Sequence, residues 1–155
     1  MAEAHSTIDV DVPVSTAYNQ WTQFEEFPQF MDNVESVRQL DDGHLHWVAD
    51  MRGTREEWTA EISVQEPDQV IGWRSIAGKG TSGEVRFEPM GESRTRVDVT
   101  MMWEPEGVTE ALGARLGLDN SMVEQDLNRF KQLVENRGQE SGAWRGEVVE
   151  GERVD

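Results

Sequence analysis

The chain has 155 residues, with 31 acidic against 14 basic side chains and a formal net charge of −17. This length suits a single domain that buries a core of its own, and so acidic a surface repels nucleic acid and anionic membranes. The sequence contains no cysteine, which excludes disulfides, a thiolate nucleophile and cysteine-based metal sites.

The first predicted elements are a strand and two short helical segments. Residues 7–12 alternate between polar and apolar side chains, which indicates a half-buried strand that Pro13 ends. Residues 15–24 change to helical spacing, with their large apolar side chains on one stripe. Pro28 interrupts the next apolar stretch, so residues 25–31 are interpreted as a second short helix or turn.

Six further strands follow, over residues 34–40, 44–51, 55–65, 70–76, 84–88 and 94–103. Turn-forming residues separate them, for example at 41–43, 66–68 and 91–93. Regular alternation indicates that one face of the sheet is buried and the other is wet, which is typical of an antiparallel sheet. The short turns make consecutive strands neighbours, as in a meander.

The last long element is a helix over residues 108–137, followed by Gly138 where a C-terminal cap is expected. Residues 139–155 are mostly glycine, glutamate and arginine, which predicts an acidic, disordered tail outside a domain of residues 1–138. The predicted fold class is therefore α+β. A seven-stranded curved antiparallel sheet wraps around the long C-terminal helix, and two short helices follow the first strand.

Neither a signal-peptide pattern nor a run of about 18 apolar residues is present in the sequence. We therefore expect a cytoplasmic protein that binds no nucleic acid and does not insert stably into membranes. The oligomeric state stays open.

The predicted inner face of the sheet, with the helices that cover it, is rich in aromatic and methionine side chains. One helix cannot fill a wide, twisted sheet, so large side chains fill the rest or a hollow for an apolar ligand remains. Aromatic and methionine side chains make adaptable walls for such ligands, although inward aromatics are also usual in a packed core. The candidate lining residues are Trp21, Phe27, Phe30, Met31, Trp47, Met51, Trp58, Trp73, Met101, Trp103, Leu112 and Leu116.

The sequence offers no metal or cofactor motif. The only histidines are His5, His44 and His46, and the last two lack a third ligand with support from the sequence. The glycine spacing of residues 78–83 resembles a dinucleotide-binding fingerprint, but a strand follows it where that motif needs a helix. We therefore predict neither a metal nor a cofactor.

Candidates for acid–base chemistry are ionisable side chains on the strands beside the inner aromatics: Asp50, Arg55, Glu57, Arg74 and Glu84. Alternation places Glu57 and Arg74 on the outer face, where a surface ion pair is the simpler interpretation. Arg74 is nevertheless the candidate polar anchor for a ligand, because a bulge in its strand would turn it inward.

Six segments carry a resemblance to a known family: residues 12–18, 21–31, 55–62, 71–75, 94–97 and 126–131. They resemble the bacterial polyketide cyclase/dehydrase family of the START-like (SRPBCC), helix-grip superfamily, over residues 4–138. The resemblance implies a cavity between the sheet and the C-terminal helix. Related members bind lipids, polyketides or quinones, and no catalytic motif of the family is matched to positions in this chain.

Three hypotheses follow for function. The apolar inner face without a catalytic constellation favours a binding protein for a hydrophobic small molecule such as a polyketide, lipid or quinone. The resemblance implies, as an alternative, a polyketide aromatase/cyclase or dehydratase. A scaffold or interaction domain with a filled core is the third hypothesis.

Overall fold

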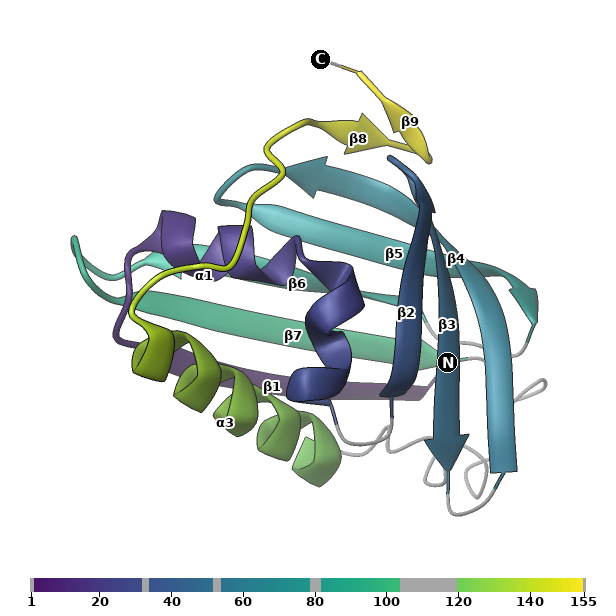
Figure 1. Ribbon diagram of the computed structural model, residues 1–155, viewed down its shortest axis with the longest axis horizontal. Helices are drawn as coiled ribbons and strands as arrows, with labels where there is room; N and C mark the ends of the chain where they lie inside the picture. The colour runs from purple at the N-terminus through teal and green to yellow at the C-terminus, as the bar shows by residue number, and fades with distance from the viewer. Residues whose placement is uncertain (1, 32–33, 52–53, 79–81, 104–119, 155) are drawn as a thin grey trace.

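The computed structural model describes residues 2–31, 34–51, 54–78, 82–103 and 120–154 (Figure 1). A large antiparallel sheet packs one face against three helical segments, so the α+β class and the C-terminal helix of the prediction are confirmed. The helical segments are α1 (Val14–Trp21), η1 (Phe24–Gln29) and α3 (Asn120–Arg137). The strands are β1 (Ala2–Val10), β2 (Val34–Asp41), β3 (His44–Met51), β4 (Thr54–Glu66), β5 (Val70–Gly78), β6 (Ser82–Pro89), β7 (Thr95–Trp103), β8 (Val148–Val149) and β9 (Glu152–Arg153).

The sheet is an open meander in which the first strand lies beside the last long strand. The seven long strands follow the order β1-β7-β6-β5-β4-β3-β2, so β1 pairs with the last of the consecutive strands, β7. The pairing of β4 with β5 shifts register twice, between Thr59 and Ala60 and between Ile62 and Val64. Such irregularities bend a strand and increase its twist, and in Figure 1 the sheet curves strongly between β7 and β2.

The number of strands and the length of the helix differ from the prediction. The sheet has nine strands rather than seven, and α3 is an 18-residue helix over Asn120–Arg137. The remainder of the predicted helix, residues 108–119, lies outside the described residues. The two additional strands, β8 and β9, come from the segment predicted as a disordered tail.

The core lies between the concave face of the sheet and the helices, and Trp21 is at its centre. The Trp21 ring packs against Phe27, Phe30 and Phe87, and against Phe130 of α3 with ring centroids 4.8 Å apart. All five rings are at least nine-tenths buried. Helix α3 is also tied to β1 because the Lys131 ammonium donates to the Asp9 carbonyl over 2.9 Å.

Residues 139–154, which we call the clasp, cross α1 and end on β4 (Figure 1). Strand β4 is longer than its pairing with β3, which covers Thr54–Glu61 only. Strand β8 pairs with the remaining edge at Val64 and Gln65, and Val148 is fully buried there. The clasp is therefore packed on the sheet, whereas the formation of a domain by residues 1–138 alone stays a prediction.

Polar side chains of α1 form the other half of this contact. The Asn19 amide donates to Glu140 over 3.0 Å and its oxygen accepts from Arg145 over 2.6 Å. The Gln20 oxygen accepts from the backbone amide of Ser141 over 2.9 Å. Because the clasp supplies these partners, a short helix with buried polar residues leaves few of them unpaired.

Candidate functional site

Three tryptophans from adjacent strands form a wall within the core, and we call Trp47, Trp58 and Trp73 the tryptophan wall. Trp47 of β3 and Trp58 of β4 are direct partners in the register. Their rings are parallel to within 7°, with centroids 5.8 Å apart. The Trp73 ring of β5 lies 6.4 Å from that of Trp47. The Trp47 ring thus stacks with both of the others. Alternation along the strands predicted that the three share a face, but not that they stack.

The Trp73 indole lies beside a glycine on the neighbouring strand. Gly83 of β6 is the register partner of Trp73. A Cβ atom at position 83 would lie 3.0 Å from the Trp73 ring and 2.5 Å from the carbonyl oxygen of Thr100. Only a residue without a side chain therefore lets Trp73 lie flat against the sheet at this point.

The wall has two polar atoms without partners. The indole N–H groups of Trp47 and Trp58 are buried and have no hydrogen-bond acceptor in the described part of the chain. Each of these residues is only 6% exposed, so bulk water does not hydrate the donors. Buried donors without acceptors are rare in folded proteins and need an explanation.

The other predicted lining residues divide into three groups. Trp21, Phe27 and Phe30 are packing residues of the aromatic core, although the Phe27 ring also lies 5.5 Å from Trp47. Met31 and Met101 are half-buried and pack against the same core. The side chains of Met51, Trp103, Leu112 and Leu116 lie outside the described residues.

Arg74, the predicted polar anchor, is on the opposite face of the sheet. Its Nε donates to Glu61 over 2.8 Å, and one terminal nitrogen donates to Glu150 of the clasp over 2.7 Å. The hydrogen bond that Arg74 donates to Glu61 raises the pKa of Arg74, and half of the Arg74 side chain is exposed. Strand β5 does shift register against β4, but not so as to turn this residue inward, and Arg74 cannot anchor a ligand at the wall.

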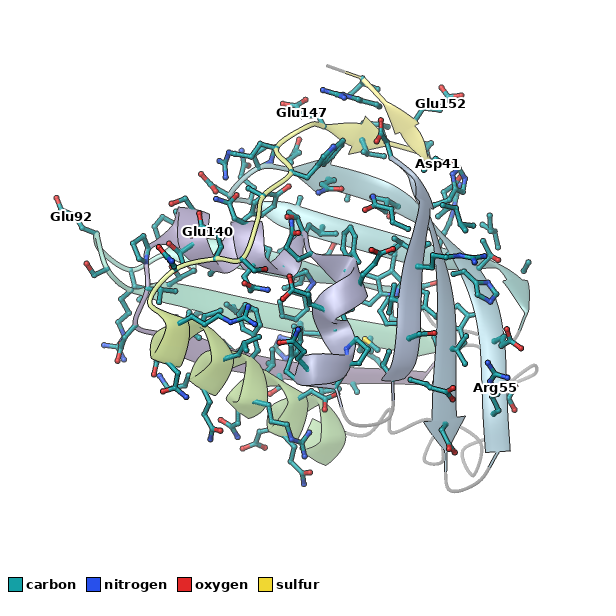
Figure 2. All side chains as sticks on the ribbon, in the orientation of Figure 1. Asp41, Arg55, Glu92, Glu140, Glu147 and Glu152 are labelled. Atoms are coloured by element: carbon teal, nitrogen blue, oxygen red, sulfur yellow. The ribbon has the colours of Figure 1, made fainter. Side chains whose placement is uncertain are left out.

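The remaining acid–base candidates also lie away from the wall. Glu57 pairs with His46 over 3.1 Å, and that hydrogen bond lowers the pKa of Glu57. Glu84 pairs with Arg86 over 2.7 Å. Arg55 is exposed at the rim of the sheet, as Figure 2 shows. Asp50 is also exposed. In the part of the chain that the structure describes, none of the five candidates is a proton-transfer group at the wall.

One buried ionisable side chain was not recognised from the sequence. Tyr18 of α1 is fully buried, its ring packs edge-on against Phe87, and the Arg145 guanidinium lies 5.6 Å from its centroid. Burial raises the pKa of Tyr18 to about 12, and the neighbouring Gln65 amide offsets only part of this shift. The raised pKa keeps the phenol neutral well above neutral pH. Helical spacing predicts that Tyr18 lies on the apolar stripe of its helix, but no local sequence signal shows that Arg145 of the clasp lies against its ring.

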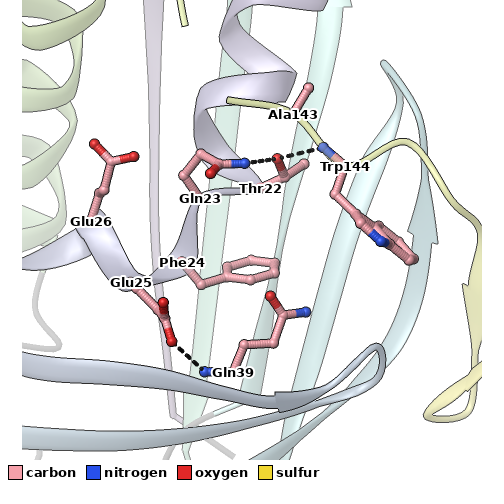
Figure 3. Close-up of a pocket in the computed structure, with 8 residues that line it drawn as sticks. All are labelled: Thr22, Gln23, Phe24, Glu25, Glu26, Gln39, Ala143 and Trp144. Carbon is pink, nitrogen blue, oxygen red and sulfur yellow. Dashed lines mark hydrogen bonds between the residues drawn. The ribbon is translucent and has the colours of Figure 1, made fainter. Parts of the chain in front are cut away.

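A separate pocket of about 330 Å³ opens on the surface between η1, β2 and the clasp (Figure 3). Its lining residues are Thr22, Gln23, Phe24, Glu25, Glu26, Gln39, Ala143 and Trp144. The Trp144 amide donates to the Thr22 hydroxyl, and the Gln39 amide donates to Glu25, both over 3.2 Å. None of the predicted lining residues borders this pocket, so it is not the hollow expected from the sequence.

The described residues hold no candidate metal centre: they contain no group of three or more His, Asp or Glu side chains placed to hold a metal ion. His44 instead pairs with Asp41 over 2.7 Å, and His5 pairs with Asp98. Among the described helices, none has the length and apolar character needed to cross a bilayer.

A curved antiparallel sheet that packs an aromatic inner face against a C-terminal helix defines the START-like, helix-grip class of proteins. Within that class, the chain belongs to the family described as "Polyketide cyclase / dehydrase and lipid transport", whose sequence profile matches residues 10–132. The family resemblance noted in the sequence is thereby confirmed. The clasp lies outside the matched residues.

Individual proteins are also similar to this chain in sequence or in fold. An uncharacterised 17.2 kDa protein from the melC2-rnhH intergenic region of Streptomyces lincolnensis is 44% identical over 150 residues, covering 96% of this chain and all of that one. The crystal structure of DR_A0006 from Deinococcus radiodurans has a TM-score of 0.71 at 26% identity, covering 89% and 99% of the two chains. The Zhui aromatase/cyclase from Streptomyces sp. R1128 has a TM-score of 0.72 at 18% identity, covering 92% and 99%, and shares the fold.

Proposed function

We propose that this protein binds a hydrophobic small molecule, of polyketide, lipid or quinone type, between the sheet and the C-terminal helix. The observation that supports it is the tryptophan wall, with three nearly parallel indoles on adjacent strands of the concave face. Flat aromatic surfaces favour flat apolar ligands, and the half-buried Met31 and Met101 add side chains that adapt to ligand shape.

The magnitude is adequate for binding without a charged anchor. Burial of roughly 300 Å² of apolar ligand surface at about 25 cal/mol/Å² contributes roughly 7 kcal/mol. Lost translational and rotational freedom offsets part of this. Since about 7 kcal/mol alone corresponds to a dissociation constant of roughly 10 μM, the expected dissociation constant after this offset is in the high-micromolar range or weaker.

Binding is favoured over catalysis by the position of the ionisable groups. Glu57, Arg74 and Glu84 are held in surface ion pairs, and general acid–base catalysis needs a group within hydrogen-bond reach of the reacting atom. The alternative, an aromatase/cyclase like the Streptomyces protein of the same fold, needs such a group next to the wall.

Native mass spectrometry and tryptophan fluorescence together test the proposal. The protein is titrated with a panel of polyketides, quinones and lipids. We expect a one-to-one adduct and a change in fluorescence that is retained in Trp144→Phe, because Trp144 belongs to the clasp and not to the tryptophan wall, and reduced in Trp58→Phe. The absence of any adduct across the panel, with unchanged fluorescence, would refute ligand binding for these classes and support the scaffold with a filled core.

A further inference from the structure

We infer that Trp47 and Trp58 determine which ligands the protein binds. Their indole N–H groups favour an uncharged ring compound with a hydrogen-bond-accepting oxygen, and they disfavour a hydrocarbon that lacks one. The inference rests on the proposed function and names the chemistry of the ligand that the wall accepts. It starts from the two buried donors that have no acceptor among the described residues.

Water is a poor partner for these two donors. A buried water molecule needs two to four polar groups around it. Among the described residues neither N–H has a hydrogen-bond partner, and the Trp47 ring packs against the rings of Phe27, Trp58 and Trp73. An acceptor that arrives on an apolar molecule satisfies the N–H groups, while the remainder of that molecule contacts the aromatic rings.

The arrangement of the two rings favours a rigid acceptor. Trp47 and Trp58 are register partners whose rings are parallel to within 7°, so their positions relative to each other are fixed by the sheet. One carbonyl oxygen has two lone pairs and can accept from two donors. A flat ring ketone, quinone or phenol combines such an oxygen with surfaces that stack on indole.

Charge disfavours the main competing ligand, a fatty acid. A carboxylate also accepts two hydrogen bonds, but its burial in an apolar wall needs a compensating cation. Arg74, the cation proposed from the sequence, lies on the other face of the sheet and is already paired with Glu61. The formal charge of −17 further opposes an anion.

A matched pair of compounds isolates the hydrogen bond. Fluorene and 9-fluorenone share one flat skeleton and differ by a carbonyl group, and equilibrium dialysis measures the affinity of both. In Trp47→Phe and in Trp58→Phe we expect 9-fluorenone to bind about tenfold more weakly, relative to fluorene, than it does in the unaltered protein. Taking the ratio of the two compounds cancels the loss of ring area that both suffer.

Trp73→Phe is the matched control. It removes the same ring area from the same wall, but the Trp73 N–H is not one of the two unpartnered donors. We expect it to weaken both compounds equally. A selective loss of 9-fluorenone in Trp73→Phe equal to that in the other two variants would overturn the assignment of the donors.

A spectroscopic measurement on the unaltered protein keeps the inference testable if a variant does not fold. In a ¹H–¹⁵N spectrum, two indole N–H signals should move downfield on addition of 9-fluorenone and stay in place with fluorene. Binding of 9-fluorenone without such movement overturns this inference and leaves the proposed function standing. Binding of palmitate alone overturns the ring-compound class, and binding of no compound refutes the proposed function together with the inference.

Discussion

Gly43→Ala should release the clasp from the sheet. Gly43 lies in the turn between β2 and β3, where Gly151 of the clasp passes directly over it. A Cβ atom at position 43 would lie 2.0 Å from the Gly151 carbonyl oxygen and 2.8 Å from its Cα. The backbone conformation of Gly43 is not one that requires glycine, so the effect comes from this contact alone.

The structure sets the size of the effect. Removing the clash needs a shift of the clasp backbone by about 1 Å, because non-bonded atoms in a close-packed structure cannot approach one another so closely. That shift breaks the backbone hydrogen bonds from Gly151 to Ile62, 2.8 Å long, and from Glu150 to Ser63, 2.9 Å long. Two such bonds contribute about 1–3 kcal/mol, and the lower entropy of the unfolded alanine chain offsets about 0.4–1 kcal/mol of the loss. The net loss is then roughly 0–2.6 kcal/mol. A loss near the middle of this range, about 1.3 kcal/mol, lowers the Tm by roughly 4 °C.

Thermal unfolding with amide hydrogen exchange is the assay. The amides of Glu150 and Gly151 should lose their protection in Gly43→Ala, while the amides of β6 and β7 keep theirs. Asp42→Ala is the control in the same turn. Asp42 meets the clasp only through an exposed ion pair with Arg153 at 4.0 Å, so its loss should change the stability by less than about 0.5 kcal/mol. An unchanged Tm with both clasp amides still protected would refute the reasoning.

Three further predictions test the core, the outer face and the clasp. Phe130→Ala should destabilise the fold by about 3–5 kcal/mol in urea unfolding, because the ring is fully buried against Trp21; a loss below about 1 kcal/mol would contradict the packing described. Arg74→Ala should change the stability by less than about 1 kcal/mol and leave ligand affinity unaltered, as an exposed ion pair predicts; a large loss of affinity would restore it as an anchor. The hydrogen bond from Asn19 lowers the pKa of Glu140 below its usual value of 4.5, so its stabilising contribution is complete above about pH 4.5 and is lost as the pH falls through the lowered pKa. Glu140→Gln should therefore flatten the acid side of a stability profile measured from pH 7 to pH 3, and an identical profile would remove Glu140 from the clasp contact.

The sheet was largely predictable because its strands have one buried face. Residues 34–40 and 55–65 were predicted as strands from alternation, and they correspond to β2 and β4 to within one residue at each end. The start of β1 was placed at residue 7, whereas the strand begins at Ala2. The missing part alternates but carries no large apolar side chain, only Ala2 and Ala4, and pairing with β7 holds it in the sheet.

The clasp could not be predicted, since its order comes from distant partners. Val148 is isolated in a polar stretch, and it is buried only because β4 extends past β3 and leaves Val64 and Gln65 to be paired. Glu150 meets Arg74 across a separation of 76 residues. A local pattern carries no information about such contacts.

Part of the candidate site followed from the same alternation. It placed Trp47, Trp58 and Trp73 on one face and Arg74 on the other, as observed. The unpaired state of the two indole N–H groups could not be predicted, because it depends on what surrounds each ring in three dimensions.

The position of β8 along the edge of β4 has a consequence for aggregation. Without β8, the backbone groups at Val64 and Gln65 would form a short open edge on a sheet rich in β-branched residues. Open edges pair with strands of other molecules. A shortened version that ends at Arg137, the last residue of α3, should therefore self-associate through this edge, which the clasp covers in the full chain.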